Sequence, residues 1–176
     1  MIRESQLGPA DDDGIGLDAI FGRVTVRLVA WADTSLEFRG VDPRSRYAEL
    51  FWLPVLGPST MWLLRHFVWR LDLSPKGAEL VLPDVARSVG IGHRAGRSAP
   101  FFRTVSRAID FGMVRVEAFD VISSRRRLPL VSPKQLSRLP DSLRMCHERW
   151  VRSSFPHESP RQSAIDAPSV AVTARS

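Results

Sequence analysis

Hydrophobic residues follow two different spacings along the chain, and the first is an alternation near the N-terminus. Between residues 21 and 31 the sequence FGRVTVRLVAW alternates along its length and is rich in β-branched side chains, which predicts a strand. One face of this strand would carry Val24, Val26, Leu28 and Ala30. A single strand must pair with another, so we expect it to join a hairpin further along the chain. Pairing with a second copy of the chain is the alternative.

The second spacing is helical and occupies the next part of the chain. Residues 47–56 are apolar and predict a short helix that Pro54 kinks or ends. Residues 60–73 predict a longer helix, with Ser59 or Thr60 as its N-cap. Its apolar positions cover a wide arc: Met61, Trp62, Leu63, Leu64, Phe67, Val68, Trp69 and Leu71. We expect this helix to be buried on most sides, with its aromatic residues in the core.

Two further helices are predicted after a short extended link at residues 78–81. The first covers residues 83–89 and ends at Gly90. The loop GIGHRAGRS, residues 90–98, is basic and contains three glycines, which favours flexibility. The second helix covers residues 99–112. Its apolar face would hold Phe101, Val105, Ala108 and Gly112, and its opposite face Arg103, Thr104, Arg107 and Asp110.

Alternation returns in residues 113–119 and 121–131, which predicts a β-hairpin. Three consecutive arginines, Arg125, Arg126 and Arg127, stand at the centre of its second strand. Because successive side chains of a strand point to opposite faces, Arg126 would face away from the other two. The three guanidinium groups therefore cannot all contact one surface.

A pair of helices is predicted after the hairpin. Ser132 is placed as an N-cap, and Gln135 occupies the reciprocal position of a capping box. Pro140 marks a break, and a second helical segment continues to about residue 153.

The two ends of the chain differ in composition from the middle. Residues 1–18 are polar and acidic, and residues 154–176 are rich in Ser, Pro and Ala, so both predict disordered segments. One domain is expected between them, at residues 19–153, around a core module at residues 59–131. Its class is predicted to be α+β.

Charge is distributed unevenly over this organisation. The chain carries 25 basic and 19 acidic side chains, a net charge of +6. Residues 1–58 contain 6 basic and 9 acidic side chains, whereas residues 82–151 contain 13 basic and 6 acidic ones. This concentration of positive charge favours a polyanionic partner for the second half.

Few residues are suited to catalysis or metal binding. Cys146 is the only cysteine, which excludes a disulfide within the chain and fits a thiol in a reducing cytoplasm. The four histidines are scattered, and there is no zinc-ligand spacing, phosphate loop or dinucleotide fingerprint. We therefore expect no enzymatic activity, no cofactor and no metal. The least polar stretch, residues 50–64, is too short and too interrupted by proline to span a membrane.

The positive charge marks a candidate interface with double-stranded DNA. Arginine can bind guanine with two hydrogen bonds, and threonine can contact phosphate or a thymine methyl group. The loop before the second helix adds arginines near a helix N-terminus, where Ser98 is the expected N-cap and phosphate binds favourably. The residues of this candidate interface are Arg94, Arg97, Ser98, Arg103, Thr104, Arg107, Arg125, Arg126 and Arg127.

The sequence LPDVARSVGIG, followed by SAPFFRTVSRAIDFGMV, resembles the winged helix-turn-helix superfamily and is similar to small actinobacterial proteins with such a domain. The resemblance covers residues 59–131. It implies a three-helix core, a recognition helix at residues 99–111 and a β-hairpin wing at residues 113–131, here with an extra N-terminal strand and C-terminal helices. The glycine-rich turn is longer than the family's pattern. Since winged helices bind DNA or proteins, we expect a cytoplasmic DNA-binding protein of regulatory or accessory type. The alternative is an interaction module that binds a protein partner or a second copy through residues 21–31 or its C-terminal helix.

Overall fold

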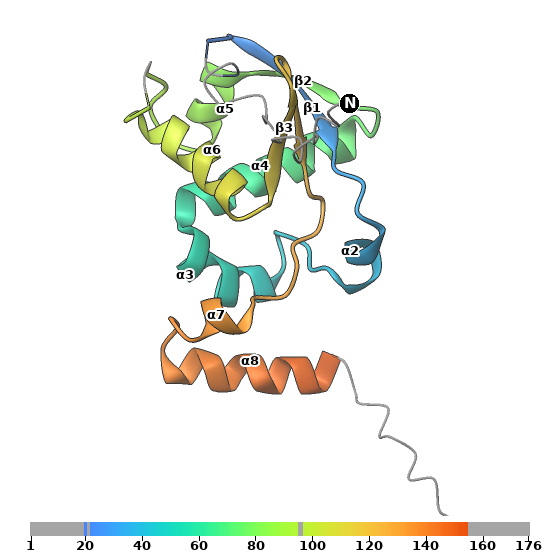
Figure 1. Ribbon diagram of the computed structural model, residues 1–176, viewed down its shortest axis with the longest axis vertical. Coiled ribbons are helices and arrows are strands. Elements are labelled where there is room, and N and C mark those ends of the chain that lie inside the picture. The colour runs from blue at the N-terminus through green and yellow to red at the C-terminus, as the bar shows by residue number, and fades with distance from the viewer. Residues whose placement is uncertain (1–19, 21, 95–96, 155–176) are drawn as a thin grey trace, which may run out of the picture.

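A four-stranded mixed sheet forms one end of the molecule, and a long helix lies at the other end (Figure 1). The computed structural model describes residue 20, residues 22–94 and residues 97–154, and these form an α+β fold. The elements are β1 (Thr25–Ala30), α2 (Thr34–Arg39), η1 (Ala48–Trp52), α3 (Leu53–Leu56), α4 (Pro58–Leu73), β2 (Ala78–Val81), α5 (Leu82–Ser88), α6 (Pro100–Asp110), β3 (Val114–Ala118), β4 (Val121–Ser124), α7 (Pro133–Leu136) and α8 (Asp141–Ser154).

The strands lie in the order β2-β1-β4-β3. β1 is antiparallel to β2 and parallel to β4, while β3 and β4 form an antiparallel hairpin with an irregularity between Val116 and Ala118. The alternation at residues 21–31 thus produces a strand that joins the hairpin, as expected. Both edges of β1 are paired inside the sheet, which leaves no free edge for a second copy. The link at residues 78–81 is a strand.

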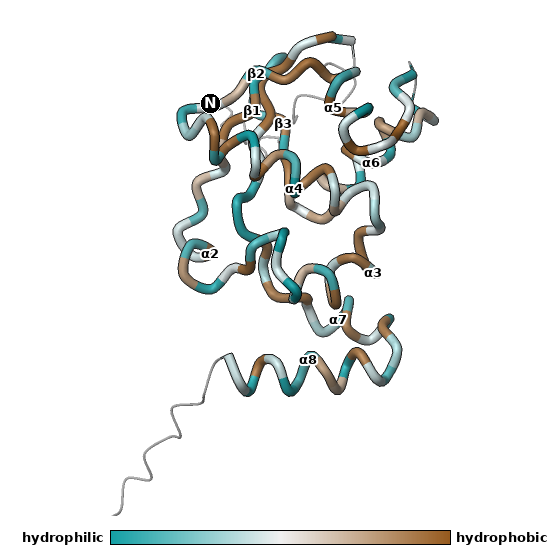
Figure 2. The backbone as a smooth tube through the Cα atoms, turned by 180° about the vertical axis from the view of Figure 1, so that it is seen from behind, coloured by the Kyte–Doolittle hydropathy of each residue, from teal (hydrophilic) through white to brown (hydrophobic). Residues whose placement is uncertain are grey.

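The hydrophobic core lies between the sheet and α4. Val26 and Leu28 of β1 are buried, and so are Leu63 and Phe67 of α4. Val24, expected on the same face as Val26, lies before the strand begins and is exposed. Figure 2 shows hydrophobic residues along the strands and α4, whereas α8 is mostly polar.

The apolar segment at residues 47–56 remains helical past Pro54. A π-helical turn, η1, precedes the proline, and the N–H of Leu53 donates to the carbonyl of Ala48. The wider turn comes where the proline ring, which has no N–H, would otherwise clash with the preceding turn. α3 then leads into Gly57 and the start of α4.

α4 differs from the sequence expectation in two ways. It begins two residues earlier, at Pro58, with Gly57 as the N-cap in place of Ser59 or Thr60, and Gly57 supplies no side-chain capping bond. In addition, Trp62 and Trp69 are 57% and 49% exposed, so the helix is not buried on most sides. Core residues cover one face of α4, and these two tryptophans lie on the other.

The C-terminal helices attach to η1 through a buried aromatic cluster. The capping box of Ser132 and Gln135 is present at the start of α7. The Tyr47 hydroxyl bonds Nε2 of His147 on α8 at 2.8 Å and accepts the backbone N–H of Val131 at 2.9 Å. Trp150 of α8 packs on the Tyr47 ring, with centroids 4.4 Å apart.

The segments expected to be disordered lie outside the described residues. This holds for the arm at residues 1–18 and for the tail at residues 154–176, apart from Ser154, which is the last residue of α8.

Candidate nucleic-acid interface

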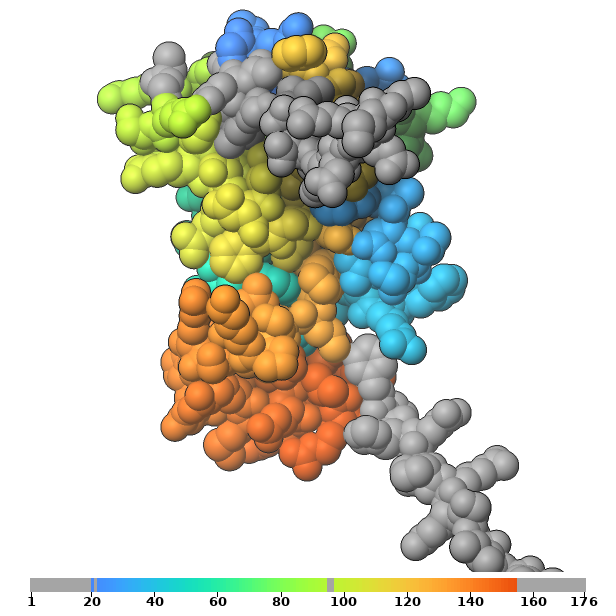
Figure 3. Space-filling view, in the orientation of Figure 1, coloured from blue at the N-terminus to red at the C-terminus, as the bar shows by residue number. Residues whose placement is uncertain are grey.

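α6 presents two arginines on its exposed face. Phe101, Val105 and Ala108 are buried against the core, as their helical spacing predicts. Arg103 and Arg107, one turn apart, are exposed on the other side. Figure 3 shows α6 (yellow) at the surface, beside the teal surface of the chain that leads into α4.

Thr104 does not share this exposed face. It is 6% exposed, and its hydroxyl donates to the carbonyl oxygen of Pro100 at 2.8 Å. The assignment of Thr104 to the polar face is therefore wrong. Positions 101, 104, 105 and 108 form one buried helical stripe. Thr104 can lie within this stripe because its hydroxyl donates to a backbone carbonyl one turn earlier in the same helix.

The two arginines of α6 differ in how firmly they are held. Nη2 of Arg107 donates to the carbonyl oxygen of Val55 at 2.8 Å, and its guanidinium lies 5.6 Å from the ring centroid of Phe111. The side chain of Arg103 makes no hydrogen bond or ion pair with any other residue that the structure describes. Neither arginine is paired with a carboxylate in the described part of the chain, so both charges remain available to an anion.

The loop between α5 and α6 adds further exposed positive charge. Arg94, Arg97 and Ser98 are exposed, while residues 95–96 lie outside the described residues. Ser98 is not the N-cap of α6: Ala99 holds that position, without a side-chain capping bond. The loop thus extends the basic surface of α6 toward the helix N-terminus, but Ser98 does not cap the helix there.

The three consecutive arginines do not lie on the hairpin. β4 ends at Ser124, so Arg125, Arg126 and Arg127 follow the strand, and the turn between β3 and β4 carries Phe119 and Asp120 instead. The expectation that residues 121–131 form one strand with arginines at its centre is wrong. A strand that long would need a pairing partner beyond β3, whereas only Leu128 forms an isolated bridge, to Val41.

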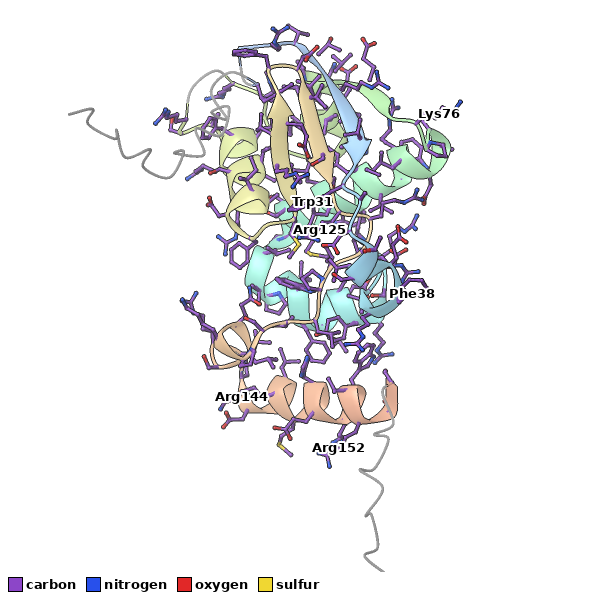
Figure 4. All side chains as sticks on the ribbon, turned by 45° about the vertical axis from the view of Figure 1, so that its right-hand side comes forward. Trp31, Phe38, Lys76, Arg125, Arg144 and Arg152 are labelled. Atoms are coloured by element: carbon purple, nitrogen blue, oxygen red, sulfur yellow. The ribbon has the colours of Figure 1, made fainter. Side chains whose placement is uncertain are left out.

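Arg125 is committed to contacts within the protein. Its side chain is 17% exposed, forms an ion pair with Asp33 and donates from Nε to the carbonyl oxygen of Gly112 at 2.7 Å. Its guanidinium lies 3.8 Å from the ring centroid of Trp31, and Figure 4 shows the two side chains together between the sheet and α2. Hydrogen bonds from Ser35 and Arg125 hold the pKa of Asp33 at about 2.

Arg126 and Arg127 also have partners within the protein. Arg126 forms an ion pair with Asp72 at the end of α4, and Nη1 of Arg127 donates to the carbonyl oxygen of Gly40 at 3.1 Å. The three arginines bind three different partners, although all three line one cavity beside Trp31 and Asp33. The expectation that they cannot share one surface depended on a strand at these positions and does not hold. Among the predicted site residues, the structure brings Arg94, Arg97, Ser98, Arg103 and Arg107 together around α6 and separates the 125–127 group from them.

A cavity of about 330 Å³ lies between the start of α4 and α6, and the sequence patterns did not indicate it. Its polar lining consists of Ser59, Thr60, Arg103, Thr104 and Arg107. The only signal in the sequence was Gly57-Pro58 ahead of Ser59 and Thr60, which predicts a helix start but not what packs beside it.

Comparison with known proteins gives no match: no family model, no curated protein and no solved structure is similar to this chain. In the part of the chain that the structure describes, no group of three or more His, Cys, Asp or Glu side chains is placed to hold a metal ion. Within the same residues, every helix is too short or too polar to cross a bilayer.

Proposed function

We propose that the chain is a DNA-binding protein of regulatory or accessory type, built on a winged helix-turn-helix arrangement. The order α4, β2, α5, α6, β3, β4 supports this reading, because it follows the helix, strand, helix, helix, hairpin order of that arrangement. β1 is an addition that lies between β2 and the hairpin. α6 then corresponds to the recognition helix.

The observation that carries the proposal is the exposed pair of arginines on α6. Arg103 and Arg107 project from one side of the helix without a carboxylate partner among the described residues, and the loop before α6 exposes Arg94. Guanidinium groups bind phosphate oxygens and can read guanine in the major groove. With Thr104 buried, two candidate base contacts remain on α6, so most of the affinity would come from phosphates.

The wing contributes little to the proposed interface. Arg125, Arg126 and Arg127 are held by Asp33, Asp72 and the Gly40 carbonyl, and the hairpin turn presents Phe119 and Asp120. A DNA-binding surface centred on α6 and its preceding loop therefore replaces the surface of helix plus wing that the sequence suggested.

Binding to a random-sequence duplex at low and at high salt tests the proposal. We expect micromolar or tighter binding at low salt that weakens steeply as salt increases, because each phosphate contact releases counterions. Substitution of both Arg103 and Arg107 by Ala should lower the slope of log affinity against log salt by about 2. Absence of salt-sensitive binding at micromolar protein would reject the proposal.

The matched control replaces two arginines at the far end of the molecule. Arg149 and Arg152 lie exposed on α8, away from α6, as Figure 4 shows for Arg152. The double variant R149A/R152A changes net charge by the same amount as R103A/R107A. It should keep the wild-type slope, so an equal effect of both double variants would indicate only a general charge effect.

A second candidate function is an interaction module that pairs with a second copy of the chain through α4. Trp62, Trp69 and Leu73 are 57%, 49% and 64% exposed, and their spacing places them along one side of the helix. Two such faces would be self-complementary about a twofold axis. Sedimentation over a concentration series should then show a dimer that W62K/W69K abolishes, without dependence on DNA. A monomer at all concentrations would reject this candidate.

A further inference from the structure

The cavity between α4 and α6 opens beside the N-terminus of a 16-residue helix. The first backbone hydrogen bond of α4 runs from the N–H of Met61 to the carbonyl oxygen of Gly57, at 3.1 Å. Pro58 has no N–H, so the amides of Ser59 and Thr60 precede that bond and point out of the helix end. Aligned peptide dipoles make such an end attractive to anions.

Gly57 keeps this helix end free of a side-chain cap. Its backbone angles are φ 79° and ψ 160°, a region that essentially only glycine adopts. Any residue whose own oxygen could cap Ser59 and Thr60 would be strained at this position. The amides are therefore left available by the backbone geometry itself.

Thr60 supplies an independent sign of a ligand. It is 2% exposed and lines the cavity, and its hydroxyl forms no hydrogen bond with any described residue. The hydroxyl oxygen is not among the fully buried unpaired side-chain atoms of the described residues, so it reaches the cavity, where a ligand can accept its hydrogen bond. Thr104 lines the same cavity and is 6% exposed, but its hydroxyl is already used in the bond to Pro100.

The charge of the lining also favours an anion. Arg103 and Arg107 line the cavity, and no Asp or Glu belongs to its lining among the described residues. The Val55 carbonyl holds the Arg107 guanidinium in place without neutralising it. The site thus combines the amides of the helix end, the hydroxyl of Thr60 and two positive charges.

We propose that this cavity binds one phosphate group, with the amides of Ser59 and Thr60 and the Thr60 hydroxyl as hydrogen-bond donors and with Arg103 and Arg107 as the balancing charge. The group is either a phosphodiester of the DNA backbone or a free phosphate. The first source rests on the proposed DNA-binding function, whereas the second does not.

Titration of the ¹⁵N-labelled full chain with inorganic phosphate, against sodium chloride at equal ionic strength, tests the site. We expect saturable shifts of the Ser59 and Thr60 amide signals with phosphate only. T60V should weaken phosphate binding by about tenfold or more, since it removes a hydrogen bond to a charged group. S59D should abolish binding, because its carboxylate occupies the helix end.

T104V is the matched control, because it makes the same change at the neighbouring buried threonine of the same cavity. The Thr104 hydroxyl already donates to the Pro100 carbonyl, so removal of this hydroxyl should leave the phosphate affinity within about twofold of the wild-type value. Equal weakening by T60V and T104V would overturn the assigned role of Thr60. Absence of saturable shifts with phosphate would overturn the site itself, whether or not the protein binds DNA.

A second titration, with a random-sequence duplex, separates the two sources. If the group is a DNA phosphate, the same two amides shift and added duplex displaces inorganic phosphate. If the duplex binds through α6 without moving these amides, the DNA source is overturned and the proposed function stands. If phosphate binds and the duplex does not bind at all, the proposed function fails and a free phosphate is the ligand.

Discussion

The guanidinium of Arg125 lies 3.8 Å from the ring centroid of Trp31, and the same guanidinium forms an ion pair with Asp33 two residues further along the chain. Arg115 lies 4.3 Å from the same indole centroid. Two arginines from the hairpin region thus hold the segment that joins β1 to α2. This arrangement gives Arg125 a structural role, in contrast to the DNA-binding role that its position in an arginine run suggests.

Replacement of Arg125 by Ala should lower the free energy of unfolding by about 1–2 kcal/mol, because it removes a mostly buried cation–π contact and a charged hydrogen bond. Urea denaturation provides the measurement. R126A removes only an exposed ion pair with Asp72 and should cost less than about 1 kcal/mol. If R125A lowered the salt slope of DNA binding while leaving stability intact, the structural role would be contradicted.

Acid should destabilise the fold through His147 before the carboxylates titrate. Burial lowers the pKa of His147 below its ordinary value of 6.5, against a smaller opposing effect of Glu148. Burial, together with Arg70, also lowers the pKa of His66. Between the lowered pKa values and pH 6.5 the unfolded chain therefore binds more protons than the folded chain. The free energy of unfolding should reach its plateau about one pH unit above 6.5 and fall as the pH decreases through that window.

Urea midpoints at pH 7.5 and about 5.5 measure this loss. H147Q keeps a polar group near Tyr47 but cannot take up a proton, so the difference between the two pH values should shrink. H66Q should remove the rest of the difference in urea midpoint between the two pH values. Asp33, Asp42 and Glu117 have lowered pKa values, so their protonation destabilises the fold only at lower pH. An unchanged pH difference in both His variants would refute the assignment.

Local patterns in the sequence predicted most of the elements. Alternation predicted β1 and the hairpin, and the capping box of Ser132 and Gln135 is present. The partners of Arg125 could not be predicted in this way, since Asp33 is 92 residues away and no local pattern encodes the pairing. An arginine run carries the same charge whether its members face solvent or carboxylates.

On α4 and α6, residue type and helix position predict different environments for three residues. The polar side chain of Thr104 favours the exposed face, although its position falls within the buried stripe of α6. Apolar residue type places Trp62 and Trp69 in the core, although both lie on the side of α4 that is about half exposed. In both helices the packing of neighbouring elements, which the sequence does not show, decides which positions are buried.

Tyr47 should be needed for α8 to remain docked. Its hydroxyl joins His147 to the backbone N–H of Val131, and burial raises the pKa of Tyr47 to about 12. Y47F keeps the ring contacts with Phe51 and Trp150 but leaves the buried Val131 N–H without a partner. We expect a loss of about 2 kcal/mol in urea denaturation and faster amide exchange in α8. Unchanged exchange in α8 would show that the aromatic contacts alone hold the helix.

Gly57 should tolerate no side chain, even though space is available. A Cβ at this position would meet no atom within 4 Å, so packing does not exclude alanine. The backbone angles do, and G57A should lower the free energy of unfolding by about 1–3 kcal/mol. Gly92 also has open space around it but no positive φ, so G92A should change stability by about 0.5 kcal/mol or less. Equal urea midpoints for G57A and G92A would mean that α4 can begin with a different backbone conformation at residue 57. The positive φ of Gly57 would then not be what keeps the amides of Ser59 and Thr60 available to phosphate.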